Sequence, residues 1–288
     1  MAAESVVTTC FRHPQVESYV RCTRCDRFIC PSCMRDASVG HQCVDCVKEG
    51  ARSIRRARTV FGGRIAAVPL VTYVLVGLNV VAYLVELARP SFEYRFAMLG
   101  TTPAGYVPQG VAHGDWYRLL TGAFLHLTPG EGTFGITHIL FNMMALWNIG
   151  RVVETQLGRV RYLALYLLSA LGGSVLELLL IPESYTVGAS GAIFGLGAAY
   201  WVMGRRLGHD MREVNRYMAG LLLWLVISAG LTSWQGHLGG LLAGAVVTLA
   251  YAYAPRDARR AQMQAGVCVA LLALLVALAW LKAASLTA

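Results

Sequence analysis

Apolar residues from Val68 onward form long stretches that short polar segments separate. Seven of these stretches predict membrane-spanning helices. They cover residues 68–87, 136–153, 162–181, 188–203, 218–231, 234–254 and 265–281. The stretches at 188–203 and 218–231 fall short of the roughly 20 residues that a full crossing needs. We therefore expect helices there that begin below the membrane surface, beside a cavity.

The composition supports this assignment to a membrane. Hydrophobic residues make up 56% of the 288-residue chain and charged residues 14%, against about 25% charged residues in ordinary soluble domains. One water-soluble core cannot bury so much apolar surface, so lipid must cover the excess. The sequence therefore predicts an α-helical polytopic membrane protein.

Basic residues between the stretches predict its orientation. With the N-terminus in the cytoplasm, 15 Lys and Arg residues after position 50 lie inside and four lie outside. The four outside are Arg89, Arg95, Arg118 and Lys282. The positive-inside rule thus predicts a multi-pass cell-membrane protein with a cytoplasmic N-terminus and an extracellular C-terminus. The net charge of +9 mostly reflects this topology, and because the first fifty residues carry six basic and six acidic side chains, we expect no nucleic-acid partner.

The first fifty residues contain a pattern of paired metal ligands. The pairs are Cys10 and His13, Cys22 and Cys25, Cys30 and Cys33, and Cys43 and Cys46. This spacing suits tetrahedral zinc, and eight ligands in four pairs fit two Zn²⁺ ions. Disulfides fit less well, because seven is an odd number of cysteines and the inferred cytoplasmic side keeps thiols reduced. His41 could replace one ligand, but it breaks the pair pattern, so we expect it not to bind zinc.

This pattern resembles B-box and RING-like cross-brace zinc fingers, in which the first and third pairs bind one metal and the second and fourth pairs the other. The resemblance implies a small zinc-stabilised module at residues 1–50 that binds a protein partner and has no chemistry of its own. Residues 51–67 follow as a basic juxtamembrane linker, which we expect to lie against anionic headgroups.

Two apolar segments each carry one half of a nucleophile and base pair. Ser190 lies among small residues at the start of the stretch 188–203, and His237 shares a helix face with Gly240 and Gly244. Small residues let helices approach closely, so the hydroxyl and the imidazole could meet. Helices often pack through small residues without any catalytic role. Here the small residues on each of the two segments surround one member of a Ser and His pair, and this favours the functional interpretation. If the two side chains meet, the protein is a hydrolase that works inside a membrane.

His138 and Asn142 are spaced i, i+4 on another predicted helix and therefore share a face. Polar residues at membrane depth normally face the protein interior or a water-filled cavity. Two donors there could stabilise a developing oxyanion, or they could form hydrogen bonds between helices. These two residues alone do not decide between the alternatives.

Several short motifs occur together in the membrane part of the chain. In chain order they are Trp116, Tyr117 and Arg118; His138 and Asn142; Gly150, Glu154 and Gly158; Gly188, Ser190 and Gly191; and His237, Gly240 and Gly244. Over residues 68–281 they closely resemble the motifs of rhomboid intramembrane serine proteases. The resemblance implies a six-helix catalytic core, here with one extra C-terminal transmembrane helix within residues 68–288, that cleaves transmembrane protein substrates in or near the lipid bilayer.

The resemblance also implies roles for single residues. Ser190 would be the nucleophile and His237 the general base, while His138, Asn142 and the Ser190 backbone N–H would form an oxyanion hole. No carboxylate stands where a third triad member is expected, so we expect a Ser-His dyad without a catalytic cofactor. We expect Glu177 to be a local polar partner rather than a residue that orients the histidine.

The surroundings of this site include a loop that the family pattern predicts and two features that depart from that pattern. Trp116 and Arg118 would belong to a membrane-embedded loop that supports the core. Residues 127–137 form a longer connection than the family usually has, and its glycines suit a mobile loop. Phe194 stands where many relatives place a tyrosine that stacks on the histidine, so a ring remains but its hydroxyl does not.

Two other functions are open on the sequence alone. A catalytically inactive rhomboid-like protein that binds transmembrane clients would be marked by loss of Ser190 or His237, and both are present. A transporter or channel with a zinc-bearing cytoplasmic domain is the other possibility, since transporters also use glycines at helix breaks. The chain shows no internal repeat and few charged residues that could form an ion path.

The basic asymmetry predicts that the two ends of the chain lie on opposite sides of the membrane. Reporter fusions after Lys48 and after Ala288 should therefore report the cytoplasmic and the extracellular side, respectively. Finding both reporters in one compartment would remove the seventh span from this topology.

Overall fold

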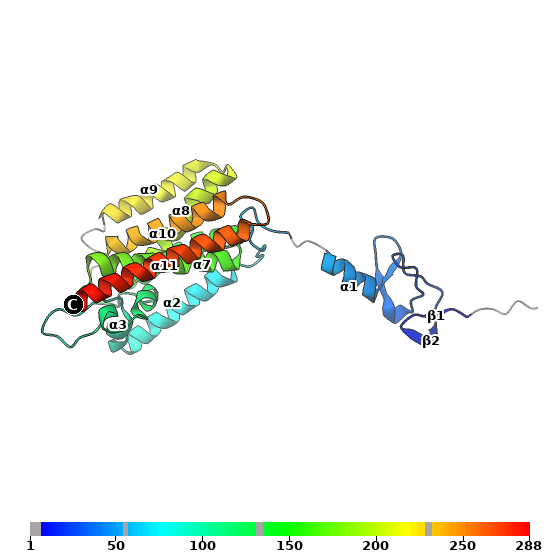
Figure 1. The fold of residues 1–288 in the computed structure, drawn as a ribbon, viewed down its shortest axis with the longest axis horizontal. Coiled ribbons are helices and arrows are strands. Elements are labelled where there is room, and N and C mark those ends of the chain that lie inside the picture. Colours follow the sequence, from blue (N-terminus) through cyan, green and yellow to red (C-terminus); the bar gives the residue numbers. More distant parts are fainter. Residues whose placement is uncertain (1–6, 54–56, 131–134, 228–231) are drawn as a thin grey trace, which may run out of the picture. The chain divides into compact units, whose positions relative to one another are not determined.

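The computed structural model describes residues 7–53, 57–130, 135–227 and 232–288 of the chain. These residues form two compact units, Met1–Ala57 and Arg58–Ala288 (Figure 1). The boundary lies inside the basic stretch that the sequence places between the zinc module and the first span. Phe61, which follows this boundary, is fully buried in the core of the second unit.

The first unit is built from two short antiparallel hairpins and one helix. Its elements are β1 (Thr9–Cys10), β2 (His13–Glu17), the 3-10 turn η1 (Pro31–Cys33), β3 (Met34–Asp36), β4 (His41–Cys43) and α1 (Val44–Ser53). Strand β1 pairs with β2, and β3 pairs with β4. Six of the seven buried residues in its core cluster are cysteines, and the seventh is Ile29. So small an apolar core cannot stabilise a domain of this size without cross-links or metal.

The second unit is helical, and each apolar stretch predicted from the sequence falls on one of its long helices. These are α2 (Leu70–Ala88), α5 (Ile136–Ala145) continued by the π-helical turn η4 (Leu146–Gly150) and α6 (Arg151–Leu157), α7 (Arg159–Leu180), α8 (Ser190–Leu207), α9 (Met211–Ile227), α10 (Trp234–Tyr253) and α11 (Arg260–Thr287). The predicted end of the fifth stretch, residues 228–231, lies outside the described residues. By length and composition, α2, α7, α10 and α11 could each cross a membrane.

Short elements occupy the connection between α2 and α5. They are α3 (Ser91–Phe96), the 3-10 turn η2 (Val111–His113), α4 (Arg118–Thr121) and the 3-10 turn η3 (Gly122–Phe124). Residues 131–134 of the long 127–137 connection lie outside the described residues, so its predicted mobility stays a prediction.

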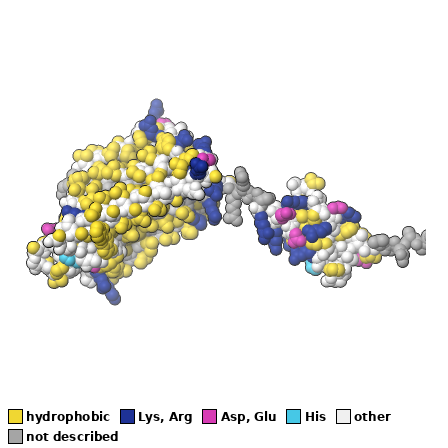
Figure 2. Space-filling model, viewed as in Figure 1, with side chains coloured by type: hydrophobic (Ala, Val, Ile, Leu, Met, Phe, Trp, Pro, Cys, Tyr) yellow, Lys and Arg dark blue, Asp and Glu magenta, His cyan; other side chains and the backbone are white. Residues whose placement is uncertain are grey.

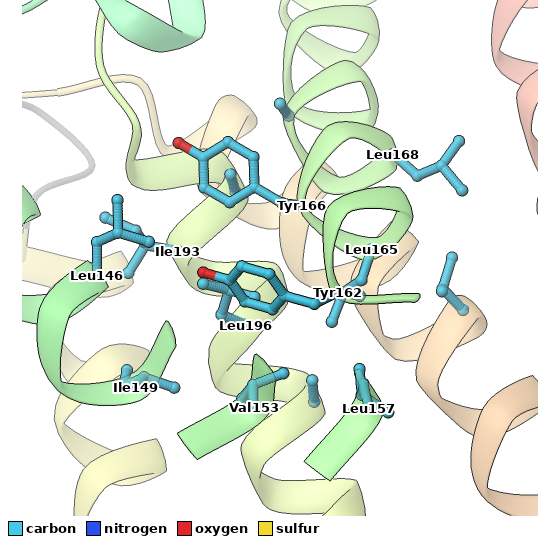
Figure 3. Packing of buried hydrophobic residues seen from close by; sticks show 14 of the residues in the cluster. Leu146, Ile149, Val153, Leu157, Tyr162, Leu165, Tyr166, Leu168, Ile193 and Leu196 are labelled. Atoms are coloured by element: carbon cyan, nitrogen blue, oxygen red, sulfur yellow. The ribbon is translucent and has the colours of Figure 1, made fainter. Parts of the chain in front are cut away.

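Apolar side chains cover much of the visible flank of the helical unit (Figure 2). Only 17% of the most apolar window of α11 and 28% of that of α2 are buried inside the protein. Lipid is the solvent that such surfaces require. Inside the bundle, Tyr162 and Tyr166 of α7 pack with Leu146, Ile193 and Leu196 (Figure 3).

Glu154 of α6 fixes the start of α2. Its carboxylate accepts hydrogen bonds from the backbone N–H of Val71 (3.0 Å) and Thr72 (2.7 Å) and from the Thr72 hydroxyl (2.8 Å). The first N–H groups of a helix have no partner within it. A fully buried carboxylate therefore finds its donors in the first turn of a neighbouring helix.

Helix α10 packs against both α7 and α8 through glycines. A Cβ atom at Gly240 would overlap the backbone carbonyl of Gly191 on α8, and one at Gly239 would overlap that of Gly172 on α7. Gly244 meets the backbone of α8 one turn further on. The three backbones therefore approach as closely as van der Waals contact allows, which drives helix association in lipid.

Gly240→Ala should lower the stability of the protein. The added methyl group has no free space, and overpacking of this kind costs about 1–3 kcal/mol. Gly266→Ala on α11 is the matched control, because nothing lies within 4 Å of its Cβ position. Thermal unfolding in detergent measures the difference. Equal unfolding temperatures for the two variants would contradict the close packing of α10 on α8.

Candidate active site

Ser190 and His237 meet across the contact between α8 and α10. Ser190 is the first residue of α8, and His237 lies in the first turn of α10, whose N-cap Ser233 accepts a hydrogen bond from Gly236 N–H (3.1 Å). His237 Nε2 lies 2.9 Å from Ser190 Oγ. A hydroxyl at this distance from an imidazole nitrogen can transfer its proton to it.

The His237 ring is oriented by packing. The Phe194 ring stacks on it with a centroid distance of 4.4 Å and an interplanar angle of 12°. His237 Nδ1 is buried, and no described residue forms a hydrogen bond with it. Phe194 follows Ser190 by one helical turn, so a single helix supplies both the hydroxyl and the ring that supports its partner.

His138 of α5 reaches the same place. The Leu127 backbone N–H donates to His138 Nδ1 at 3.2 Å, so in the neutral ring the proton is on Nε2. His138 Nε2 lies 2.9 Å from the ideal Cβ position of Gly188, which is itself 3.6 Å from Ser190 Oγ. Gly188 has a φ of 123°, and only glycine fits this backbone conformation beside the imidazole. The arrangement leaves an N–H donor close to the serine.

Asn142 lies one turn further along α5. Its amide Nδ2 donates to the His138 carbonyl at 2.9 Å. An amide group carries two N–H donors, so one is used within the helix and one is left for another acceptor. The structure thus places His138 beside Gly188 and in the same cavities as Ser190, while Asn142 shares its amide with its own helix.

Two cavities meet at these residues. One, of about 170 Å³, is lined by Ser190, His237 and His138 together with Glu177 and Tyr185. The other, of about 350 Å³, includes the first three side chains and is otherwise mainly apolar. Its walls come from α5, α8 and α9 and include Phe141, Asn142, Phe194, Leu221 and Trp224. The serine can therefore be approached from a partly polar side and from an apolar side.

Glu177 of α7 borders the smaller cavity without touching His237 Nδ1. Its Oε2 accepts a hydrogen bond from the Thr186 hydroxyl (2.8 Å), and its Oε1 lies so close to Gly236 that a Cβ atom would not fit there. It therefore links α7, the segment before Ser190 and the first turn of α10. From the sequence we expected Glu177 to be a local polar partner, because it is an acid inside an apolar stretch. The sequence did not indicate which segments this residue joins.

Arg118 organises the connection between α2 and α5. It is 1% exposed; its Nε donates to Asp115 Oδ2 (3.0 Å), and its Nη1 donates to the carbonyls of Tyr94 (2.9 Å) and Ala97 (3.0 Å). Trp116, two positions before Arg118, is 39% exposed. The buried guanidinium joins the end of α3 to the turn before α4, and the sequence motif had no signal for its carbonyl partners.

The metal-ligand pairs of the first unit form two clusters. One joins Cys10, His13, Cys30 and Cys33, and the other joins Cys22, Cys25, Cys43 and Cys46. Within each cluster the ligand atoms all lie within 4.8 Å of one another. This combines the first pair with the third and the second with the fourth, as in the cross-brace that the spacing resembles. Neither cluster includes His41, whose Nδ1 lies 3.4 Å from Asp36 Oδ1.

At least one thiol in each cluster favours the form that binds metal, whereas burial and the neighbouring cysteines raise the pKa of Cys33 to about 11 and that of Cys46 to about 12. Burial by itself raises the pKa of the Cys10 thiol, but the backbone N–H groups of Cys30, Arg12 and His13 outweigh it and lower the pKa to about 6. The pKa of Cys22 is lowered to about 6 in the same way. Thiolates are the metal-binding form of cysteine, so the donor set fits a cation such as a divalent metal ion.

Comparison with known proteins identifies the family. The rhomboid domain family matches residues 113–254, which include Ser190 and His237. The chain is 33% identical over 184 residues to "Putative rhomboid protease YdcA" of Bacillus subtilis, covering 61% of this chain and 85% of that protein. The chain belongs to the rhomboid family. With its apolar helices, this makes it a multi-pass membrane protein.

Two other rhomboid relatives cover different shares of the chain. Rhomboid protease GluP of Bacillus subtilis is 35% identical over 141 residues, which is 46% of this chain and 26% of GluP. Rhomboid-like protease 3 of Toxoplasma gondii is 29% identical over 215 residues, which is 71% of this chain and 78% of that protein. The matched part thus spans only about a quarter of GluP, and the first unit with its two metal-ligand clusters lies outside the rhomboid domain match.

Proposed function

We propose that the chain is an intramembrane serine endopeptidase that hydrolyses peptide bonds of transmembrane substrates. The observation that carries this proposal is the 2.9 Å contact between His237 Nε2 and Ser190 Oγ at the meeting of two cavities. Neither side chain needs that contact for helix packing, which the glycines of α8 and α10 provide. The family, whose relatives are named proteases, agrees with it.

The chemistry follows from the positions of the donors and acceptors. His237 takes the proton of Ser190 as Oγ attacks the scissile carbonyl, and it then returns that proton to the leaving amine. The Ser190 backbone N–H is the first of α8 and has no acceptor within the helix, so with His138 Nε2–H it can bind the developing oxyanion. Asn142 adds the amide proton that its own helix leaves over. Water from the smaller cavity then hydrolyses the acyl-enzyme, with His237 again as the base.

The apolar cavity gives the substrate its route. The side chains of a transmembrane segment are apolar and are in contact with lipid. They can move from lipid into contact with the cavity wall formed by Phe141, Leu221 and Trp224 and stay in apolar surroundings. We also place the N-terminus in the cytoplasm of a cell-membrane protein. We divide the chain into a module at 1–50, a basic linker at 51–67 and the membrane domain at 68–288, with the part of the linker from Arg58 onward packed in the second unit.

Ser190→Ala, His237→Ala and the double variant should all reduce cleavage of a transmembrane reporter to a similar low level. The two side chains perform one step together, so their losses are strongly non-additive. Asn142→Ala should lose less than either, because one oxyanion donor contributes about 3–4 kcal/mol and other donors remain. Cleavage by purified protein in detergent measures these effects.

A fluorophosphonate probe should label Ser190 in the native protein and not in the Ser190→Ala variant. Ser285→Ala, an exposed position on α11, is the control that should cleave and be labelled normally. Normal reporter cleavage by Ser190→Ala would rule out the proposed site.

We further propose that each cluster of the first unit binds one structural Zn²⁺ ion, and that the module so formed binds a protein partner. The support is the donor chemistry: three thiols with one imidazole, and four thiols, each set within reach of a single ion. Tetrahedral sites of these compositions are typical of structural zinc. The metal would replace the apolar core that this unit lacks.

A fragment of residues 1–57 should bind two Zn²⁺ ions and unfold when a chelator removes them. Cys22→Ser should weaken one site and leave the other occupied, whereas His41→Ala should leave both intact. Metal analysis and circular dichroism provide the two readouts. A stoichiometry of one zinc, or loss of zinc from the His41→Ala variant, would contradict the assignment of the ligands.

A further inference from the structure

Arginines gather where α7 and α11 begin and where α8 and α10 end. We name this the arginine cluster. It consists of Arg58, Arg161, Arg206, Arg256 and Arg260. Arg260 experiences repulsion from Arg161, Arg206 and Arg256, and Arg161 experiences repulsion from Arg58. Like charges held this close destabilise a fold unless something balances them.

The cluster is held in place by the protein. Arg260 lies against Gly62, whose ideal Cβ position is 3.2 Å from Arg260 Nε, and its Nη2 donates to the Val60 carbonyl at 2.5 Å. Arg161 Nε donates to Gln264 Oε1 at 2.8 Å. The buried Gln264 amide in turn donates to two backbone carbonyls, those of Phe61 and Tyr251. The guanidinium groups of Arg161 and Arg260 are therefore positioned before any ligand arrives.

Nothing in the described part of the chain neutralises this charge. No salt bridge there joins a member of the cluster to a carboxylate. Asp257, the acid next to Arg256 in sequence, accepts the backbone N–H of Arg259 (2.8 Å). Arg260 Nε is buried and has no hydrogen-bond partner among the described residues. A buried guanidinium N–H without an acceptor is costly.

The helix ends add to the positive potential. Both α7 and α11 begin here, at Arg159 and Arg260, and a helix N-terminus carries a partial positive charge. Arginine at such a position is unfavourable for the isolated helix. Its presence at two neighbouring N-termini is explained if an anion occupies the space between them.

The depth of the cluster identifies the anion. Helices α7, α10 and α11 are long and apolar enough to cross a membrane, so their ends lie at the level of the lipid headgroups. Directly after Arg260, α11 exposes apolar side chains, including Met263 (50% exposed) and Val269 (65% exposed). A ligand that suits both features has a phosphate group that accepts paired hydrogen bonds from the guanidinium groups, and acyl chains that contact the exposed apolar face of α11.

We propose that the arginine cluster is a binding site for the phosphate group of an anionic phospholipid, whose acyl chains lie along α11. The site is distinct from the Ser190 and His237 cavities, and it requires neither proteolytic activity nor a particular orientation of the chain. Binding of the lipid would tie the starts of α7 and α11 to the ends of α8 and α10.

The test uses the purified full chain in nanodiscs of phosphatidylcholine with and without phosphatidylglycerol, with lipid binding measured by native mass spectrometry. Arg161→Gln and Arg260→Gln should each bind phosphatidylglycerol about fivefold more weakly than the native chain, since an arginine near anionic lipid contributes about 1 kcal/mol. Arg216→Gln removes the same charge from an 81% exposed side chain that pairs with Glu213. This control should bind as the native chain does.

Arg260→Lys keeps the positive charge but loses the paired N–H donors of the guanidinium group. This variant should therefore bind phosphatidylglycerol more tightly than Arg260→Gln and more weakly than the native chain. The unfolding temperature of the native chain is a second measurement, and it does not depend on whether a variant folds. It should be higher with phosphatidylglycerol than without it. Equal unfolding temperatures in the two lipids, or equal binding by Arg161→Gln, Arg260→Gln and Arg216→Gln, would overturn the proposal. Protection by inorganic phosphate as strong as that by the lipid would overturn the assignment to a phospholipid.

Discussion

Backbone contact between helices is the constraint on which the rest of the membrane unit depends. Helix α10 touches α7 through Gly239 and α8 through Gly240 and Gly244, without intervening side chains. In lipid such contacts are stabilised by van der Waals packing rather than by the hydrophobic effect. They also determine the 2.9 Å distance between His237 and Ser190, because a helix displaced by one methyl group would separate the two side chains beyond hydrogen-bond reach.

Buried polar groups complete this arrangement by joining segments that glycine packing does not reach. Glu154 binds the first turn of α2, Arg118 binds the carbonyls of the long connection after α2, and Glu177 binds Thr186 just before the serine. In a membrane each such group must find its partner within the protein. Each of these groups therefore fixes one segment of the chain relative to another. Glu177 fixes the segment that precedes Ser190.

The parts of this structure that the sequence predicts are those with a local signal. Apolar length marks the helices, short cysteine spacing marks the two metal-ligand clusters, and small residues around Ser190 and His237 mark the close helix contact. The parts that it does not predict depend on distant segments. The burial of Phe61 in the second unit and the carbonyl partners of Arg118 are of this kind. No spacing along the chain encodes them.

Helix α8 connects the two chemical features of the membrane unit and sets the depth of the proposed active site. Ser190 begins this helix, and Arg206 near its end donates to the carbonyl of Ala252 (3.1 Å), where α10 also ends. At 1.5 Å per residue the sixteen steps between Ser190 and Arg206 span about 24 Å, whereas the hydrocarbon core is about 30 Å thick. With Arg206 at one headgroup layer, as we propose for the arginine cluster, the serine would lie a few ångströms below the other. At that depth a peptide bond would still be within the membrane, and the smaller cavity beside Ser190 would need only a short path to bulk water.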